Sequence, residues 1–392
     1  MSSTSPRDLQ FLQRCVDLAQ LPGSQISPNP RVGAVLVYQD RIIGEGNHQQ
    51  YGASHAEVNC LASVAEKDRP FISASTLYVS LEPCCIYGRT PPCTNLILDH
   101  AIPRVIIGQI DQTASVHGKG IAILQEAGVE VISYPYFQPA ARVAQARQLY
   151  AGQDRPFVLL KYAQSADGFL APSQQGSYWI TSDISRRMVH FWRSRTRAIV
   201  VGAGTILADN PQLNTRLYPG PSPLPIIIDL KGEIRRTDFR VFQRAGEEPP
   251  ILVQPVGIQA LDHCDQVVFP VDWLDEIKHW DFRRCQVIAS TAKSDAAATK
   301  KAAQAFAQKL VSLVMQELHH RKHNHLTVEG GSSILQLFLL ANCWDEARVF
   351  TGQTTYFTAG LTAPRLPGAP IKTYSLGADQ LSVWLNDDSF LT

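Results

Sequence analysis

The order of apolar and polar positions up to residue 150 predicts helices and strands in alternation. Apolar residues at helical spacing over 8–20 stop before Pro22-Gly23, which indicates a first helix. Two short β-rich runs, 32–37 and 41–45, are separated by Gln39-Asp40 and predict a hairpin. The further predicted elements are a helix at 56–65, a strand at 76–81, a helix at 94–98, strands at 104–108 and 129–133, and a helix at 140–150. Such alternation is typical of an α/β layer with parallel strands.

A second alternation follows the segment 152–156, whose Gly, Asp and Pro residues are typical of a linker. It consists of a strand at 157–162, a helix at 184–195, strands at 198–201 and 225–230, a long helix within 297–319, a strand at 326–329, a helix at 333–340 and a strand at 346–351. We therefore expect two α/β domains, 1–151 and 152–392. Two domains also suit a chain of this length, at roughly 150 residues per domain.

Composition narrows the class of protein. Apolar residues make up 45% of the chain and charged residues 18%, as in globular proteins with sizeable cores. The first residues lack the pattern of a signal peptide, and no run of 18 apolar residues occurs, so we expect a cytoplasmic protein without a membrane partner. The net charge is +1 and no basic block is present, which disfavours nucleic acid and favours a small-molecule substrate.

The eight cysteines fall into two groups. Without a secretory signal they indicate core residues, metal ligands or nucleophiles rather than a disulfide framework. Five stand singly and are expected to be small buried hydrophobes: Cys15, Cys60, Cys264, Cys285 and Cys343. The other three, Cys84, Cys85 and Cys93, cluster after a predicted strand.

This cluster, with His55 at the start of a predicted helix, indicates a catalytic metal site. His55, Cys84 and Cys93 supply one imidazole and two thiols, which are zinc ligands. Three ligands leave a fourth position for water, whose pKa zinc lowers toward neutrality. Glu57 is then free to act as the acid/base in hydrolytic deamination. Adjacent residues rarely point the same way, so only one of Cys84 and Cys85 is expected to be a ligand.

The second domain carries weaker local signals. Several predicted strands end in polar loops, where α/β sheets bind their ligands. Gly202-x-Gly204 falls short of a dinucleotide fingerprint, and a plain strand-to-helix turn is the more common meaning of such a pair.

The segment 81–94, Leu-Glu-Pro-Cys-Cys-Ile-Tyr-Gly-Arg-Thr-Pro-Pro-Cys-Thr, resembles the bifunctional riboflavin-synthesis deaminase/reductase family. Its two outer cysteines are separated by eight residues, unlike the C-x-x-C spacing of cytidine and tRNA adenosine deaminases. The resemblance implies that Cys84, which follows Pro83, is the ligand rather than Cys85. Segments 28–33 and 46–48 are also similar to the family. The resemblance implies that Asn29 and His48 contact the ribose phosphate side of the substrate.

The same family resemblance extends over the second domain, through segments 161–168, 176–181, 201–211 and 328–332. It implies a cytidine-deaminase-like α/β/α domain followed by a dihydrofolate-reductase-like α/β domain. Implied NADPH contacts are Ala163, Trp179, Thr205, Asp209, Gly331 and Ser332. Implied substrate contacts are Ser177, Arg193, Leu213, Arg216 and Glu329. A homo-oligomer is a further expectation from this resemblance.

The resemblance implies zinc-dependent deamination of 2,5-diamino-6-ribosylamino-4(3H)-pyrimidinone 5′-phosphate, followed by NADPH-dependent reduction of the ribosyl to the ribityl side chain. The chain departs from the family at Cys85-Ile86-Tyr87, where a polar histidine is common, and at Asp111-Gln112-Thr113-Ala114, although Gly118-Lys119-Gly120 is kept. One alternative is therefore a working reductase with a degenerate deaminase domain. Others are a nucleoside or tRNA deaminase fused to an unrelated domain, and a nucleotide-sensing or structural protein.

Overall fold

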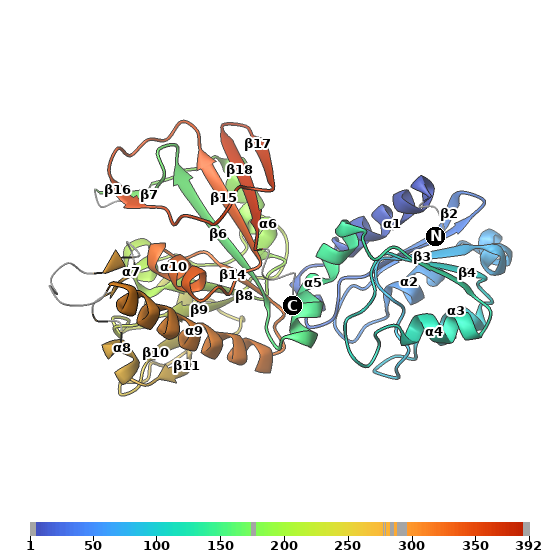
Figure 1. Ribbon diagram of the computed structural model, residues 1–392, viewed down its shortest axis with the longest axis horizontal. Coiled ribbons are helices and arrows are strands. Elements are labelled where there is room, and N and C mark those ends of the chain that lie inside the picture. Colours follow the sequence, from blue (N-terminus) through green and yellow to red (C-terminus); the bar gives the residue numbers. More distant parts are fainter. Residues whose placement is uncertain are drawn as a thin grey trace. The chain divides into compact units, whose positions relative to one another are not determined.

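The computed structural model describes residues 5–173, 178–276, 278, 280–282, 286–287 and 296–386. The chain forms two compact units, Met1–Pro156 and Phe157–Thr392 (Figure 1). The last helix of the first unit continues to Gly152, so that the connection between the units is a short segment before Phe157.

The first unit is a five-stranded mixed sheet between helices. Strands β3, β4 and β5 are parallel, whereas β1 runs antiparallel to both β2 and β3, in the order β2-β1-β3-β4-β5. Its elements are α1 (Pro6–Ala19), β1 (Gly33–Tyr38), β2 (Arg41–Asn47), α2 (Ala56–Ala62), a 3-10 helix (Glu66–Ala74), β3 (Thr76–Val79), α3 (Cys93–Asp99), β4 (Arg104–Ile107), α4 (Lys119–Glu126), β5 (Glu130–Ser133) and α5 (Gln138–Gly152).

Two apolar clusters hold the helices on opposite faces of this sheet. On one face Leu12 and Cys15 of α1 pack against Val35 and Ile106. On the other, α2, α3 and α4 contribute Cys60, Ile97 and Leu124 to a separate cluster. Helix α2 packs closely on β2. A Cβ at Gly46 would come 2.2 Å from the backbone nitrogen of Cys60, so this approach requires glycine at position 46. This close approach fixes the start of α2, where His55 and Glu57 stand.

The second unit contains a nine-stranded sheet in the order β11-β10-β9-β8-β14-β6-β15-β18-β17. Its strands run parallel from β11 to β15, and β18 and β17 complete it as antiparallel strands. The strands are β6 (Phe157–Ser165), β7 (Phe169–Pro172), β8 (Ala198–Gly202), β9 (Leu224–Ile228), β10 (Ile251–Pro255), β11 (Asp265–Phe269), β12 (Trp280–Asp281), β13 (Gln286–Val287), β14 (His325–Val328), β15 (Glu346–Gly352), β16 (Gly360–Thr362), β17 (Lys372–Leu376) and β18 (Asp379–Leu385). The helices are α6 (Asp183–Arg193), α7 (Ala203–Asp209), α8 (Asp272–Asp275), α9 (Ala296–His320) and α10 (Ser332–Leu340).

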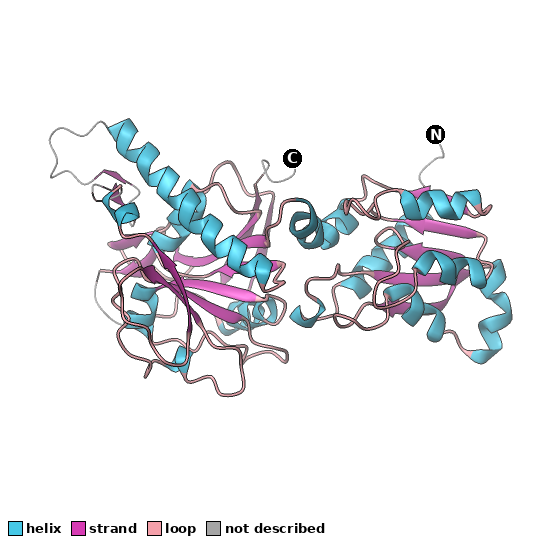
Figure 2. Ribbon diagram, turned by 90° about the horizontal axis from the view of Figure 1, so that it is seen from below, coloured by secondary structure: helices cyan, strands magenta, loops and turns pink. Residues whose placement is uncertain are grey.

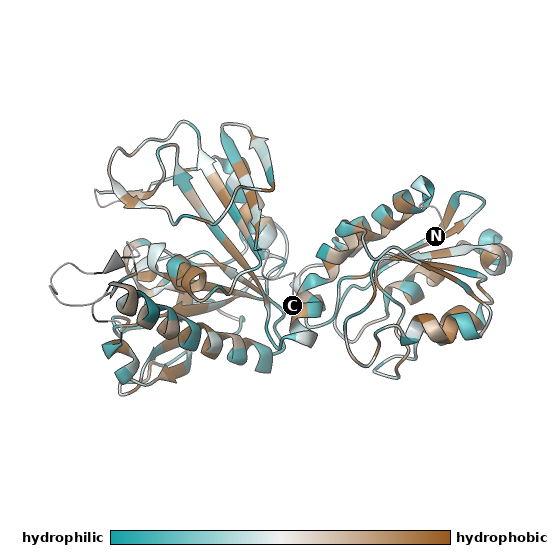
Figure 3. Ribbon diagram, viewed as in Figure 1, coloured by the Kyte–Doolittle hydropathy of each residue, from teal (hydrophilic) through white to brown (hydrophobic). Residues whose placement is uncertain are grey.

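Helices also cover this second sheet on both faces (Figure 2). Helices α9 and α10 pack Phe306, Leu310 and Phe338 against the central strands, which Figure 3 colours as the hydrophobic interior. Across the sheet, α7 contributes Ile206 to a second cluster, and α6 contributes Val189 to a third. The central parallel strands are buried on both sides, as an α/β arrangement requires.

No helix in the described part of the chain is long and apolar enough to cross a membrane.

Candidate functional sites

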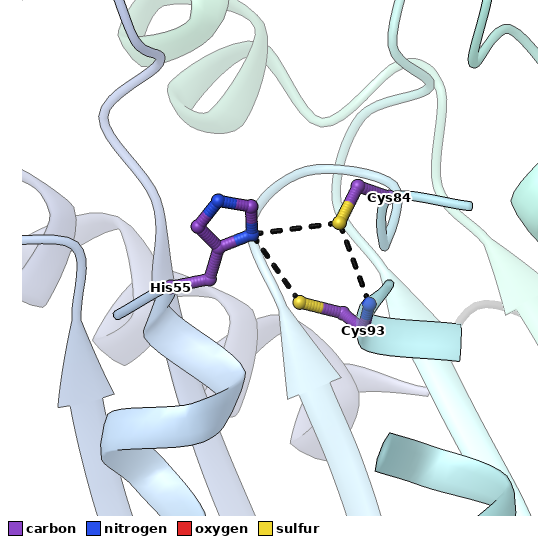
Figure 4. A group of neighbouring side chains, drawn as sticks. All are labelled: His55, Cys84 and Cys93. Atoms are coloured by element: carbon purple, nitrogen blue, oxygen red, sulfur yellow. Dashed lines mark hydrogen bonds between the residues drawn. The ribbon is translucent and has the colours of Figure 1, made fainter. Parts of the chain in front are cut away.

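Three short element ends bring the predicted metal ligands of the first unit together. His55 is the residue before α2, Cys84 lies in the loop after β3, and Cys93 begins α3. The His55 Nδ1 atom is 3.4 Å from the Sγ atom of Cys84 and 3.4 Å from that of Cys93 (Figure 4). The backbone N–H of Cys93 also donates to the Cys84 Sγ atom, at 3.4 Å. The three ligand atoms all lie within 4.8 Å of one another.

The chemistry of these donors suits zinc. The two cysteines are close enough to affect each other, since their contact lowers the pKa of Cys84 and raises the pKa of Cys93. A cation would hold both sulfurs as thiolates. Cys85 points elsewhere, with its Sγ atom 3.9 Å from the carbonyl oxygen of Ser115.

Glu57 is the second residue of α2, beside this ligand set, and is 3% exposed. Burial, and then the charge of Cys84, raise the pKa of its carboxyl group. A buried carboxyl group beside a metal-bound water is placed to take up a proton and to release it again.

A cavity of about 340 Å³ opens over these residues and is lined by His55, Glu57 and Cys84. His48 and Asn29 line its wall and contact each other, with Asn29 Nδ2 2.9 Å from His48 Nε2. The other ring nitrogen of His48 is 2.9 Å from the carbonyl oxygen of Ser54, so the ring donates there and accepts from Asn29. Burial lowers the pKa of His48 and keeps this ring neutral.

Two arginines that line the same cavity were not among the sequence predictions. Arg89 lies with its guanidinium carbon 4.8 Å from the ring centre of Tyr51, and Arg147 comes from α5. In the described part of the chain neither forms an ion pair with an acidic side chain. The Gly-Arg-Thr motif was a signal for Arg89, but a single arginine on a polar helix gave none for Arg147. Ile86 also lines the cavity, where the family commonly has a histidine.

In the second unit the structure pairs two predicted substrate contacts. Glu329 follows β14, and Arg193 ends α6. Arg193 donates to both Glu329 oxygens, from Nε at 2.9 Å and from Nη2 at 2.7 Å, while its Nη1 donates to the carbonyl oxygen of Asn214 at 3.1 Å. Lys161 of β6 adds a third charge, with Nζ 3.6 Å from Glu329 Oε2.

These three side chains are largely buried from solvent: those of Lys161, Arg193 and Glu329 are 16%, 12% and 6% exposed. Burial opposes ionisation of Glu329, but the charges of Arg193 and Lys161 overcome it and lower the pKa of its carboxyl group to about 2. Lys161 was not predicted as a site residue, although it begins the segment 161–168 that resembles the family. Its signal was a charged residue within the otherwise apolar strand 157–162.

Arg216 and Leu213 lie in the loop between α7 and β9. Leu213 is buried and has a φ of 53°, a conformation that a non-glycine residue adopts at a cost. The backbone N–H of Arg216 donates to Nδ1 of His190 at 3.1 Å. Burial, then the charges of Arg193 and Arg216, lower the pKa of His190 to about 4, which keeps that acceptor available.

Predicted cofactor contacts gather where β8 and β14 end side by side. The N–H of Gly331, which precedes α10, donates to Thr205 Oγ1 of α7 at 3.3 Å. A Cβ at Gly330 would lie 2.7 Å from the Val201 Cα atom, so only glycine lets the loop after β14 approach the end of β8 this closely. Ser332 is the first residue of α10 and is buried.

The remaining predicted contacts are spread over other elements. Ala163 is on β6, Asp209 ends α7, and Trp179 precedes α6 and is 64% exposed. The Arg186 guanidinium carbon lies 4.2 Å from the ring centre of Trp179. Ser177 lies outside the described residues.

Fold and site together define a deaminase-type zinc-site unit joined to a second α/β unit with a buried group of charged side chains. Residues 5–109 match the family described as "Cytidine and deoxycytidylate deaminase zinc-binding region". Residues 156–355 match the family described as "RibD C-terminal domain".

Relatives carry the same two parts. A riboflavin biosynthesis protein RibD of Escherichia coli is 35% identical over 62% of this chain and 68% of that protein. RibD of Actinobacillus pleuropneumoniae is 39% identical over 57% of this chain and 58% of that protein, so the match spans about three-fifths of its length. A solved Thermotoga maritima structure, a diaminohydroxyphosphoribosylaminopyrimidine deaminase/5-amino-6-(5-phosphoribosylamino)uracil reductase, is 29% identical with a TM-score of 0.78 and covers 96% of this chain and 98% of its own.

This chain belongs to the RibD family. The expected fold class, with a cytidine-deaminase-like first domain and a dihydrofolate-reductase-like second domain, is confirmed. The expected cofactors, Zn²⁺ and NADPH, are those of these two families.

Proposed function

We propose that this chain performs two successive steps of riboflavin synthesis on one pyrimidine. The first is hydrolytic deamination of 2,5-diamino-6-ribosylamino-4(3H)-pyrimidinone 5′-phosphate, and the second is NADPH-dependent reduction of its ribosyl to a ribityl side chain. The observation that carries the proposal is the convergence of His55, Cys84 and Cys93 beside buried Glu57 at a cavity, in a chain of the RibD family.

In the first step a water molecule adds to the ring carbon that bears the 2-amino group, and ammonia leaves. Zinc held by His55, Cys84 and Cys93 would lower the pKa of that water molecule. Glu57 takes one proton from the water molecule and delivers it to the ring nitrogen, then takes the second from the added hydroxyl group and delivers it to the departing amino group as the carbonyl forms. Its burial excludes bulk water as a competing proton acceptor.

The cavity wall is suited to the rest of this substrate. Asn29 and neutral His48 form a hydrogen-bonded pair in the cavity wall, and we assign this part of the wall to the ribose side of the substrate. Arg89 and Arg147, which lack acidic partners in the described part of the chain, place two positive charges around the same cavity. Guanidinium groups bind phosphate through paired N–H donors, so we assign the 5′-phosphate to this pair.

In the second step NADPH supplies the hydride that converts the ribosyl to the ribityl group. The amide groups of the Gly331–Ser332 turn at the start of α10 suit the cofactor phosphates, because a helix N-terminus favours anions. Thr205, Asp209, Ala163 and Trp179 are the further contacts proposed from the resemblance.

The predicted substrate contacts of the second unit differ in whether their polar groups already have partners within the protein. The Nε and Nη2 groups of Arg193 both donate to Glu329, so the proposed role of Arg193 is to hold that carboxylate in place. Glu329 then presents a fixed negative charge to the sugar, and exposed Arg216 is the phosphate ligand. Leu213 and Ser177 complete the proposed set of substrate contacts.

We place this activity in the cytoplasm and assign it no nucleic-acid or membrane partner. A homo-oligomer stays a prediction from the family resemblance, and light scattering of the purified chain tests it.

A mass-spectrometric time course tests the proposal. The purified, zinc-loaded protein is incubated with the diaminopyrimidine ribosyl phosphate and NADPH, and the expected product is both deaminated and reduced. Ile86 in the cavity wall favours one competing outcome, a degenerate deaminase. In that case the first substrate stays intact while separately supplied deaminated intermediate is reduced. Failure of both steps would overturn the proposal.

A further inference from the structure

Glu82, two residues before the ligand Cys84, is a buried carboxylate that pairs with no lysine or arginine in the described part of the chain. It is 4% exposed. Its partners are instead four backbone N–H groups from the segment 111–121. Oε2 accepts from Asp111 at 3.3 Å and from Gly118 at 3.0 Å. Oε1 accepts from Gly120 at 3.0 Å and from Ile121 at 3.4 Å.

Two of these donors, Gly120 and Ile121, lie in the first turn of α4, whose N–H groups have no partner within their own helix, and a third, Gly118, is the N-cap residue. Gly118, the residue before α4, has no side chain to cap them. Glu82 therefore caps α4 from a distant part of the chain, and its negative charge faces the positive end of the helix dipole.

The kept Gly118-Lys119-Gly120 motif has a physical reason in this contact. A Cβ at Gly120 would lie 2.3 Å from the carbonyl oxygen of Pro83, between Glu82 and Cys84. Gly118 has a φ of 70°, in the left-handed region that favours glycine. The start of α4 can therefore rest against the loop that carries the metal ligand only where these residues are glycine.

The segment tied down in this way forms one wall of the deaminase cavity. Asp111, Thr113, Ser115 and Val116 all line the cavity. Asp111 is itself bonded within the segment, since its Oδ1 accepts from the N–H of Thr113 at 2.7 Å. The wall is fixed at its two ends, Asp111 and Gly118, by the same carboxylate oxygen.

We propose that Glu82 is a positioning residue for deamination, which sets the distance between the cavity wall 111–118 and the metal ligand Cys84. Glu82 also lines the cavity, but both of its carboxylate oxygens accept from backbone N–H groups, so it acts through the wall. Its loss loosens the wall and weakens substrate binding, while the ligands His55, Cys84 and Cys93 are kept. This inference rests on the proposed deaminase function.

The test uses Glu82→Gln in the full-length, zinc-loaded protein. Glutamine has nearly the same size, but its amide group turns donors toward N–H groups that need acceptors. We expect a KM for deamination about tenfold higher, kcat changed much less, and faster hydrogen exchange of the amides in 111–121. Zinc content and the reduction of deaminated intermediate by the second unit stay as in the wild type.

A second variant and a control complete the design. Gly120→Ala displaces the start of α4 from the Pro83 carbonyl oxygen while Glu82 keeps its carboxylate, and it should reproduce the rise in KM and in exchange. Glu126→Gln makes the same chemical change at an exposed position in the last turn of α4 and should change neither.

Unchanged exchange and unchanged KM in Glu82→Gln would overturn the inference. So would a loss of zinc and of kcat at constant KM, because Glu82 would then support the ligands and not the wall. If the wild-type protein does not deaminate, the proposed function fails, and the exchange of 111–121 still decides whether Glu82 holds this wall.

Discussion

At the scale of single residues, the site of the first unit depends on a buried carboxyl group, that of Glu57, whose pKa is raised by burial. Glu57 has no role as a metal ligand in the geometry of the site, so its removal separates proton transfer from metal binding. We expect Glu57→Gln to lower kcat for deamination by about 100- to 10,000-fold, the usual contribution of a general acid/base. Zinc content and reductase activity should stay at wild-type values. Full deamination by a zinc-loaded variant would contradict the role of Glu57.

The residues that sequence reasoning found share one property: their order and spacing along the chain carry the chemistry. His55, Glu57, Cys84 and Cys93 stand at predicted turns between strands and helices, and the structure gathers them there. Glu82 was visible in the same motif, but its partners are backbone N–H groups 29 to 39 positions away. Almost every residue type has a backbone N–H donor, so no sequence pattern indicates which of them will bind a given carboxylate.

The ion pair between Arg193 and Glu329 in the second unit could not be predicted from the sequence for a different reason. Arg193 and Glu329 are 136 positions apart and meet only because α6 and β14 pack in one unit. In the sequence Arg193 is an ordinary helix arginine, and only the family resemblance singled it out. The partner of a charge is a property of the tertiary structure, so it could not be predicted from composition or periodicity.

At the scale of elements, alternation predicted most of the buried strands but missed the buried strand β10 as well as exposed ones. Strands β6, β8, β9, β14 and β15 are central and apolar, and each was predicted. Strand β17 was not, because four of its five residues are exposed and its sequence is polar. Its pairing with β18, rather than its own pattern, makes it a strand.

Helix α6 gives a test of how one element is anchored. Asp379, at the start of β18, is 4% exposed. Its Oδ2 atom accepts from the N–H of Ser182 at 2.8 Å and from the hydroxyl groups of Ser182 and Ser185 at 2.6 Å each. The carboxylate thereby caps the N-terminus of the helix that carries Arg193 and His190.

We expect Asp379→Asn to lower the free energy of unfolding of the second unit by about 1–3 kcal/mol, since buried hydrogen bonds to a charge are replaced by weaker ones. Urea unfolding followed by tryptophan fluorescence measures this, because all six tryptophans lie in the second unit. Asp238→Asn is the control, since that side chain is 64% exposed in a surface ion pair with Arg236. Equal stability of the two variants would show that the cap contributes nothing.

At the scale of the whole molecule, the second unit contains buried histidines that acid should charge. Burial first, and then neighbouring arginines, lower the pKa of His190 to about 4 and that of His323 to about 3. In the unfolded chain both have the ordinary value of about 6.5. Between these values the unfolded chain binds more protons than the folded one, so stability falls as the pH falls from 6.5 toward 4.

The tryptophan-detected free energy of unfolding should therefore decrease steadily over this range. His190→Asn removes one titrating group, while its amide oxygen can still accept from the N–H of Arg216. That variant should show a shallower dependence on pH than the wild type. A free energy of unfolding that stays constant between pH 6.5 and 4 would disprove this account.

Each unit has its own apolar core and draws its site residues from its own elements, so removal of the metal should affect the two activities differently. Chelation removes the cation that would hold Cys84 and Cys93 as thiolates. We expect deamination to disappear on dialysis against a chelator and to return on addition of Zn²⁺. Reduction of deaminated intermediate and the tryptophan-detected unfolding transition should not change, because neither depends on the first unit. A parallel loss of reduction would mean that the metal site of the first unit also supports the second, and the two-site proposal would then have to be replaced by a single coupled one.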